Sequence, residues 1–206
     1  MKITVKAFIY SFLFICLGSA AHAQINMPDS VRVGLGAELA SATGTGFGTG
    51  VTTDAGGTAA AAYSYGVGLV LRGDIPVMSH LYATATLGYI SFLPTGKSSY
   101  SQQAILKTSL PDFNTIPIKV GLKWLLGNRF YVQGEIGETF LANKKELYAL
   151  YGNSVTWSPQ IGLVLPLKKR HTYIDAGLRY ERTESFYNDS NHNTFWALHI
   201  AYEFNL

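Results

Sequence analysis

The chain contains almost no cysteine, little charge and no long apolar run beyond its first residues. Its one cysteine is Cys16, and Asp, Glu, Lys and Arg together make up 14% of 206 residues. After the first residues, no apolar stretch approaches the roughly 20 residues that a transmembrane helix needs. These scarcities exclude a disulfide scaffold and a helical membrane protein, and they argue against a soluble secreted domain.

The first 23 residues have the organisation of a secretory signal peptide. Two early lysines precede an apolar core at 7–17, and Ala21-His22-Ala23 places small residues at positions −3 and −1. This pattern predicts cleavage between Ala23 and Gln24, which leaves one domain, 24–206. Because Cys16 lies in the apolar core, the mature chain would have no thiol for catalysis or metal binding. Its formal net charge falls from +3 to about +1, which argues against a nucleic-acid partner.

The last twelve residues alternate between an apolar and a polar set. Trp196, Leu198 and Ile200 fall on one face, whereas Ala197 and His199 fall on the other. A period of two is typical of a β-strand. The same alternation recurs along the mature chain and predicts eight strands, at 31–41, 63–72, 80–92, 114–126, 129–142, 154–166, 171–183 and 194–206.

The connections between these strands alternate between long and short. Short connections are predicted at 73–76, 127–128 and 168–170, whereas 42–62 and 93–113 are long. Outer-membrane barrels have short periplasmic turns and longer outer loops, and an even strand number puts both ends in the periplasm. The predicted fold is therefore all-β, an eight-stranded antiparallel transmembrane β-barrel that follows a cleaved signal peptide.

Charged residues in the predicted strands fall mainly on the polar face, with five of each sign. Eight strands enclose an interior just wide enough for side chains, and an unpaired buried charge is costly. We therefore expect an internal salt-bridge network that fills the lumen, rather than a pore. Glu138 is the one charge that the pattern places on the lipid face. The expected network consists of Arg32, Glu38, Arg72, Lys119, Lys123, Glu135, Asp175, Arg179, Glu181 and Glu203.

Aromatic residues gather near both ends of the apolar faces. Two outward belts are typical of membrane interfaces and argue against a soluble lipocalin-like barrel, whose apolar residues would face inward. The outer belt is expected to contain Tyr63, Tyr65, Tyr89, Phe140, Trp157, Tyr180 and Trp196, and the periplasmic belt Trp124, Phe130 and Phe204.

The sequence offers two weak candidates for chemistry. His199 is predicted to face inward beside Asp175 and Glu181, but no serine follows it in the pattern of lipid A deacylases, so an interior histidine is favoured. The alternating glycines at 44–50 have neither the following helix nor the lysine of a phosphate-binding loop, so a flexible outer loop is favoured. We expect no catalytic, metal-binding or cofactor-binding residues.

The chain resembles the small eight-stranded outer-membrane barrels of the OmpX and OmpA-barrel type. More closely, it resembles the outer membrane protein beta-barrel domain proteins common in Bacteroidota. The resemblance rests on the cleavage segment 21–24, the glycine-rich alternating strands and the ending 201–206. It implies insertion by the barrel-assembly machinery, which reads the terminal strand. Many relatives end in Phe, whereas here Phe204 precedes the final Leu206 on the same face.

The function favoured by these patterns is structural or surface-interacting, in a monomer of the outer membrane that acts through its outer loops. The expected partners are outer-membrane lipids and lipopolysaccharide, whose lipid A phosphates Lys97, Lys107, Lys144 and Lys145 could neutralise. A narrow channel for small solutes and a lipid A-modifying enzyme are the alternatives.

Overall fold

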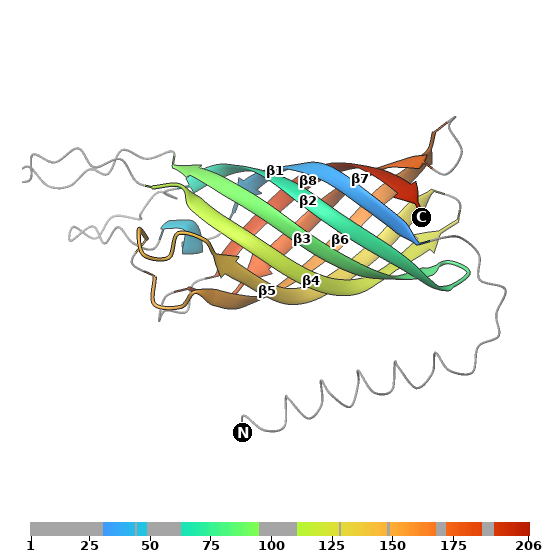
Figure 1. Ribbon diagram of the computed structural model, residues 1–206. Helices are drawn as coiled ribbons and strands as arrows, with labels where there is room; N and C mark the ends of the chain where they lie inside the picture. Colours follow the sequence, from blue (N-terminus) through green and yellow to red (C-terminus); the bar gives the residue numbers. More distant parts are fainter. Residues whose placement is uncertain are drawn as a thin grey trace, which may run out of the picture.

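Eight antiparallel strands close into one barrel in sequence order, with the last strand paired to the first (Figure 1). The computed structural model describes residues 31–43, 45–48, 63–94, 111–127, 129–147, 149–167, 172–186 and 192–206. Within these ranges, no helix is long and apolar enough to cross a membrane. The elements are β1 (Arg32–Ala42), the 3-10 helix η2 (Thr45–Gly48), β2 (Tyr63–Met78), β3 (Leu81–Pro94), β4 (Phe113–Leu126), β5 (Phe130–Leu141), β6 (Asn153–Pro166), β7 (Thr172–Thr183) and β8 (Asn193–Asn205).

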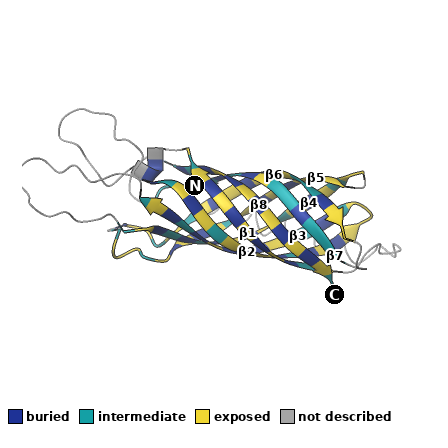
Figure 2. Ribbon diagram, turned by 90° about the horizontal axis from the view of Figure 1, so that it is seen from above, coloured by how far each residue is buried: buried dark blue, intermediate teal, exposed yellow. Residues whose placement is uncertain are grey.

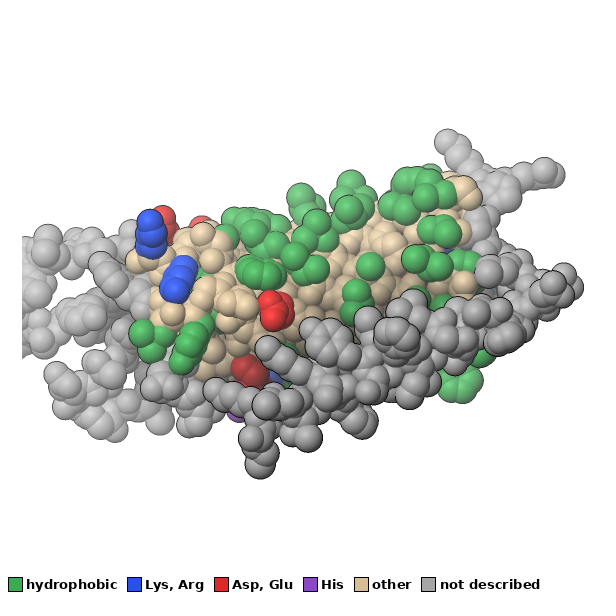
Figure 3. All heavy atoms as spheres, turned by 60° about the horizontal axis from the view of Figure 1, so that its bottom comes forward, with side chains coloured by type: hydrophobic (Ala, Val, Ile, Leu, Met, Phe, Trp, Pro, Cys, Tyr) green, Lys and Arg blue, Asp and Glu red, His purple; other side chains and the backbone are tan. Residues whose placement is uncertain are grey.

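The alternation of side chains determines which face of each strand is outside. On β8, Leu198 and Ile200 are 60% and 62% exposed, whereas His199 is 1% exposed. Figure 2 shows the same alternation of buried and exposed residues around the barrel, and Figure 3 shows apolar side chains spread over the wall. An apolar exterior around a polar interior is the arrangement of a barrel that faces lipid, and the predicted eight-stranded antiparallel fold is confirmed.

The two ends of the barrel differ in their connections. The connections β1–β2, β3–β4, β5–β6 and β7–β8 meet at one end, which we call the loop end. The three short connections and the start of β1 meet at the other end, together with the end of β8; we call this the turn end (Figure 1). The long connections thus share one end of the barrel and the short connections the other, as their alternation in the sequence predicted.

One predicted turn is wrong. The segment 73–76 does not connect two strands, because β2 continues to Met78 and the turn lies at Ser79 and His80. Gly, Asp and Pro in succession are typical of turns. Here Asp74 instead faces the lumen, where the Nζ atom of Lys123 lies 2.8 Å from its Oδ2 atom. Pro76 lies beyond the last β1–β2 pair, on an edge where its missing N–H is tolerated.

The tight turn between β4 and β5 requires a glycine. Gly127 has a φ of 72°, in the left-handed region that residues with a Cβ atom rarely adopt. Gly134, by contrast, lies within β5, and a Cβ atom added there would meet nothing within 4 Å.

These two glycines give a matched test of the turn. We expect Gly127→Ala to lower the free energy of unfolding by about 1 kcal/mol, because it forces a Cβ atom into the left-handed region. Gly134→Ala should change it by no more than a few tenths of a kcal/mol. Urea titration of both variants in the same detergent would measure the difference, and equal losses would contradict this account of the turn.

Candidate functional site in the lumen and at its two ends

All ten charged residues of the predicted network face the lumen, and none is more than 5% exposed. Asp175 on β7 lies at the centre of one group of contacts. Its Oδ2 atom accepts hydrogen bonds from Lys123 Nζ at 2.7 Å and from Arg72 Nη1 at 3.2 Å. Its Oδ1 atom accepts from the Tyr131 hydroxyl at 2.6 Å and lies 2.8 Å from His199 Nε2. One carboxylate therefore joins β7 to β2, β4, β5 and β8.

A second group of charges lies closer to the loop end. Lys119 Nζ lies 2.6 Å from Glu181 Oε2 and 3.5 Å from Glu135 Oε2. Arg179 binds Glu38 through two parallel hydrogen bonds of 2.7 and 2.8 Å, the geometry that makes arginine–carboxylate pairs strong. Paired in this way, the buried charges avoid the desolvation cost of isolated ions.

The prediction of the network missed one member. Asp74 is 1% exposed and contacts Lys123, so the described lumen holds six carboxylates against five Lys and Arg side chains. Asp74 was omitted from the predicted network because 73–76 was predicted to be a turn, whereas these residues belong to β2. The signal was present, since Arg72, Asp74 and Pro76 continue the inward period of β2. Glu203 also lies near Lys123, with Oε1 3.6 Å from Nζ.

Glycines on β6 and β7 make room for the largest uncharged members of the network. A Cβ atom at Gly162 would lie 2.5 Å from the ring of Tyr131, and one at Gly177 would lie 2.7 Å from the ring of His199. Gln160 completes this group, since it donates to the Tyr131 hydroxyl and accepts from Arg72. The close contacts leave this level of the lumen filled by side chains.

Aromatic side chains close the lumen at the loop end. Phe47 of η2 enters the mouth and packs on Phe92, Phe113 and Phe195, with ring centroids 4.6, 5.4 and 6.4 Å away. Phe186 and Ile90, both 0% exposed, belong to the same cluster. We call this group the aromatic plug. Its rings pack at the distances of favourable aromatic pairs.

The plug corrects the expectation for the first long connection. The described part of 42–62 is not a free loop, because η2 lies inside the mouth and Phe47 is 3% exposed. Gly46 permits this approach, since a Cβ atom there would lie 2.5 Å from the carbonyl carbon of His192. Phe47 is the one aromatic residue among the glycines, threonines and alanines of 42–62, and that was the available signal. Gly44 and Gly50 lie outside the described residues.

The predicted aromatic belts lie on the outer wall, with one exception. Tyr65, Trp124 and Phe130 are 65%, 57% and 63% exposed. Neighbouring rings of the outer belt contact one another in tilted arrangements, with the ring centroid of Tyr180 5.7 Å from that of Trp157 and 5.2 Å from that of Trp196. Tyr89, Phe140 and Phe204 are also exposed.

Tyr63 was wrongly placed in the outer belt. It is 6% exposed and belongs to the aromatic plug, where its hydroxyl donates to the carbonyl of Pro111 at 2.7 Å. A register shift between Tyr63 and Tyr65 turns the first residue of β2 inward and breaks the period of two. Glu138 does face outward, close to the loop end of β5, and Asn153 donates to it at 3.0 Å.

The His199–Asp175 pair lies within the network rather than at an accessible surface. His199 also lies 3.5 Å from Arg72 Nη1 and from the Tyr131 hydroxyl. Ser158, the buried serine of β6, instead accepts from Lys119 at 3.1 Å. The histidine therefore forms part of a filled interior, and its arrangement differs from the serine–histidine contact that acyl transfer requires.

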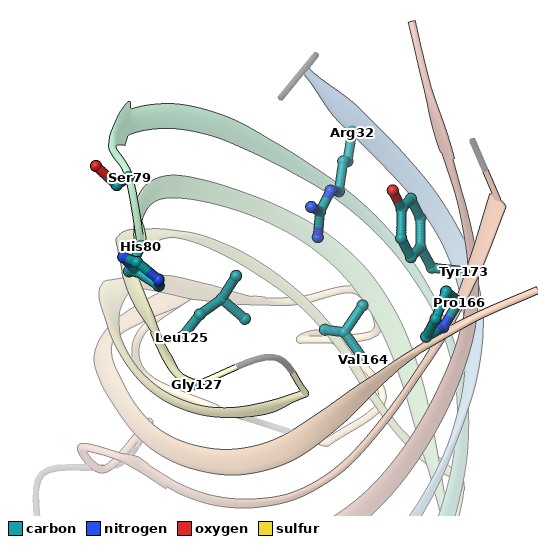
Figure 4. A pocket seen from close by; sticks show the side chains of 8 residues that line it. All are labelled: Arg32, Ser79, His80, Leu125, Gly127, Val164, Pro166 and Tyr173. Carbon is teal, nitrogen blue, oxygen red and sulfur yellow. The ribbon is translucent and has the colours of Figure 1, made fainter. Parts of the chain in front are cut away.

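The turn end of the lumen contains a cavity of about 310 Å³ (Figure 4). Its lining includes Arg32, Ser79, His80, Leu125, Val164 and Tyr173. The guanidinium of Arg32 lies 5.0 Å from the ring centre of Tyr82 and 4.5 Å from that of Tyr173. Arg32, a predicted member of the network, also donates a 3.2 Å hydrogen bond to the Tyr82 hydroxyl.

Proteins similar to this chain are found among solved structures. No family model matches the chain, and no curated protein matches it either. Among solved structures it is similar to the attachment invasion locus protein Ail of Yersinia pestis, at 12% identity and a TM-score of 0.46, covering 86% of this chain and 100% of that one. It is also similar to Neisserial surface protein A, at 12% identity and a TM-score of 0.49, with 85% of this chain and 97% of that one covered. A third similar structure is the outer membrane protein OprG of Pseudomonas aeruginosa, at 10% identity and a TM-score of 0.48, with 86% of this chain and 96% of that one covered.

The barrel itself gives the location of the protein. The barrel is closed, eight-stranded and antiparallel, with exposed leucine, isoleucine and valine on its outside and charged side chains inside. This is the architecture of an outer-membrane protein. The protein is an outer-membrane β-barrel. The predicted cleavage site at Ala23 and Gln24 lies outside the described residues.

The buried ion pairs should be essential for stability. We expect Lys119→Met to lower the free energy of unfolding by about 3 kcal/mol or more, because Glu181 and Glu135 would lose their shared cation. Glu135→Gln should also destabilise the barrel, since it removes one of the charges near Lys119. The exposed Lys144→Met is the control and should have little effect. Thermal unfolding in detergent would compare the variants, and no loss for Lys119→Met would contradict a network that stabilises the fold.

Proposed function

We propose that the protein is a structural and surface-interacting outer-membrane barrel that does not conduct solutes. The observation that carries this proposal is the double closure of the lumen. Phe47 and its neighbours fill the loop end, and the contacts of Asp175 and Lys119 fill the levels below. A pore would need open space and usually a bias of one charge sign. A closed interior leaves the two ends and the outer surface of the barrel for interactions.

The β5–β6 connection supports an interaction surface at the loop end. Asn143 holds it in place: its side-chain amide donates to the carbonyl of Asp112 at 2.6 Å, and its Oδ1 atom accepts from the backbone of Asn114 at 3.3 Å. Lys144 and Lys145 are exposed on this anchored turn. Leu150 is exposed on the same connection.

This combination fits lipopolysaccharide as a partner. Its lipid A phosphates are anionic and its acyl chains are apolar, which matches lysines and apolar side chains beside the membrane wall. Lys97 and Lys107, which the sequence assigns to the same role, lie outside the described residues. We extend the proposal to insertion of a monomer by the barrel-assembly machinery, which would read β8, and to membership of the Bacteroidota type of small barrel.

The lipid A-modifying alternative has less support. The His199–Asp175 pair is buried inside the barrel, with His199 1% exposed, whereas the acyl esters of lipid A lie outside the wall. The proposal therefore retains no catalytic role for this pair.

Conductance is the direct test of the closed lumen. In planar lipid bilayers, we expect the purified barrel to give no discrete current steps. Phe47→Ala should also give none, because the charged network beneath the aromatic plug remains in place. A general porin inserted in the same membrane is the positive control. Regular steps from the unmodified protein would overturn the proposal.

Charge reversal tests the interaction surface. We expect Lys144→Glu with Lys145→Glu to weaken lipopolysaccharide binding about fivefold or more, because attraction to the phosphates becomes repulsion. Lys144→Arg with Lys145→Arg keeps both charges and should bind like the unmodified protein. Titration of lipopolysaccharide onto barrels in nanodiscs would measure both pairs, and unchanged affinity after reversal would exclude this surface.

A further inference from the structure

The aromatic plug packs against the connection that carries the proposed interaction surface. Besides its rings, the buried cluster around Phe47 includes Ala149 of the β5–β6 connection, which is 7% exposed, and Leu147 packs against this cluster. Lys144 and Lys145 belong to the same connection and are exposed. One short segment therefore has its apolar residues on the plug and its lysines at the surface.

Backbone hydrogen bonds join the buried and exposed parts of this connection. The N–H of Ala149 donates to the carbonyl of Lys144 at 3.2 Å, and the N–H of Leu147 donates to the carbonyl of Asn143 at 3.3 Å. Displacement of Ala149 from the plug would therefore disturb a hydrogen bond to a residue of the interaction surface. The position of Lys144 thus depends on the packing of Ala149.

Rings from other parts of the chain form a second link to this connection. Phe47 packs on Phe113, and Phe113 packs on Phe186 with ring centroids 5.8 Å apart. The backbone carbonyl of Phe186 accepts a hydrogen bond of 3.0 Å from the N–H of Tyr151, near the end of the β5–β6 connection. Phe47 is therefore linked to both the middle and the end of the segment that carries the lysines.

Phe47 differs from its neighbours in how it is held. Phe92 and Phe195 lie within strands, so the barrel wall fixes their positions. Phe47 instead comes from η2, between β1 and β2, where the N–H of Gly46 donates to the carbonyl of His192 at 3.2 Å. Loss of the Phe47 ring would therefore alter the plug while leaving the strands of the wall intact.

We propose that the packing of Phe47 in the aromatic plug is coupled to lipopolysaccharide binding at Lys144 and Lys145, which makes Phe47 a positioning residue for that surface. This inference rests on the proposed function. Phe47 is 3% exposed, so it acts through the β5–β6 connection and not by contact with lipopolysaccharide. When only a fraction of the molecules has the binding arrangement, the apparent affinity falls in proportion to that fraction.

Amide hydrogen exchange tests the positioning step without any lipopolysaccharide. In the full-length protein in nanodiscs, Phe47→Ala should accelerate exchange at Ala149 about tenfold, because local opening of the connection breaks its hydrogen bond. Phe47→Leu keeps an apolar side chain and should have a smaller effect, and the amide of Ile136 within β5 should not change. Unchanged exchange at Ala149 in folded Phe47→Ala would overturn the proposal.

Binding titrations then test the coupling. Lipopolysaccharide added to the same nanodiscs should bind Phe47→Ala about fivefold more weakly than the unmodified protein, and Phe47→Leu should recover most of the affinity. Tyr82→Leu is the matched control, because Tyr82 is a lumen ring at the turn end, 1% exposed, and its loss should leave the affinity unchanged. A heat-dependent mobility shift on SDS gels checks folding. If Phe47→Ala does not fold, Phe47→Leu takes its place and should show the same changes to a smaller degree.

The reciprocal effect is measured in the unmodified protein. Because linkage between two equilibria is mutual, saturating lipopolysaccharide should slow exchange at the amides of Ala149 and Gly46. Lys144→Glu with Lys145→Glu should lose this protection. Exchange that stays the same when lipopolysaccharide is bound would contradict the coupling.

Failure of the coupling is distinguishable from failure of the proposed function. If reversal of both lysine charges weakens binding and Phe47→Ala does not, the surface stands and the coupling is overturned. If neither change weakens binding, the surface is wrong and the coupling is overturned with it. Equal losses of affinity in Phe47→Ala and Tyr82→Leu would assign the effect to general destabilisation of the barrel and would also overturn the proposal.

Discussion

The fold depends on burying charges inside a narrow barrel without leaving any of them isolated. Asp175 is central to this, because its two oxygen atoms contact Lys123, Arg72, Tyr131 and His199 from four other strands. These strands are not all neighbours in the sheet, so the contacts cross the lumen and add to the hydrogen bonds between strands. In water such pairs would contribute little, but in a dry interior their loss would leave costly unpaired charges.

The lumen is divided into levels with different chemistry. Charged and polar side chains fill its middle, and the aromatic plug around Phe47 fills the loop end. Glycines such as Gly162 and Gly177 are as important as the large residues, since they provide the space that Tyr131 and His199 occupy. A filled interior of this kind leaves the two ends and the outer wall as the accessible surfaces.

The two ends of the barrel differ in composition. The loop end presents lysines and apolar side chains on a connection that Asn143 anchors. The turn end presents a cavity lined by Arg32, whose guanidinium lies near two tyrosine rings. The loop end is the surface that we propose for contact with lipopolysaccharide.

The sequence by itself determined the number of strands, their order of long and short connections, and which residues face inward. These properties follow from a period of two, because a lipid-facing wall and a polar lumen leave little choice at each position. All ten network residues and nine of the ten belt residues lie on the faces that the pattern indicated. The pattern failed where local chemistry and tertiary contacts disagreed, at Asp74 and at Tyr63.

Tertiary structure alone decided which charges pair, what closes the mouth and where a cavity remains. The partners of Asp175 come from strands far apart in sequence, and periodicity carries no information on contacts across the lumen. Phe47 joins the plug because the closed barrel brings Phe92, Phe113 and Phe195 together at one level. The register shift at Tyr63 and the contacts of Arg32 with two tyrosine rings also depend on packing between strands. The sequence of a single strand does not encode such packing.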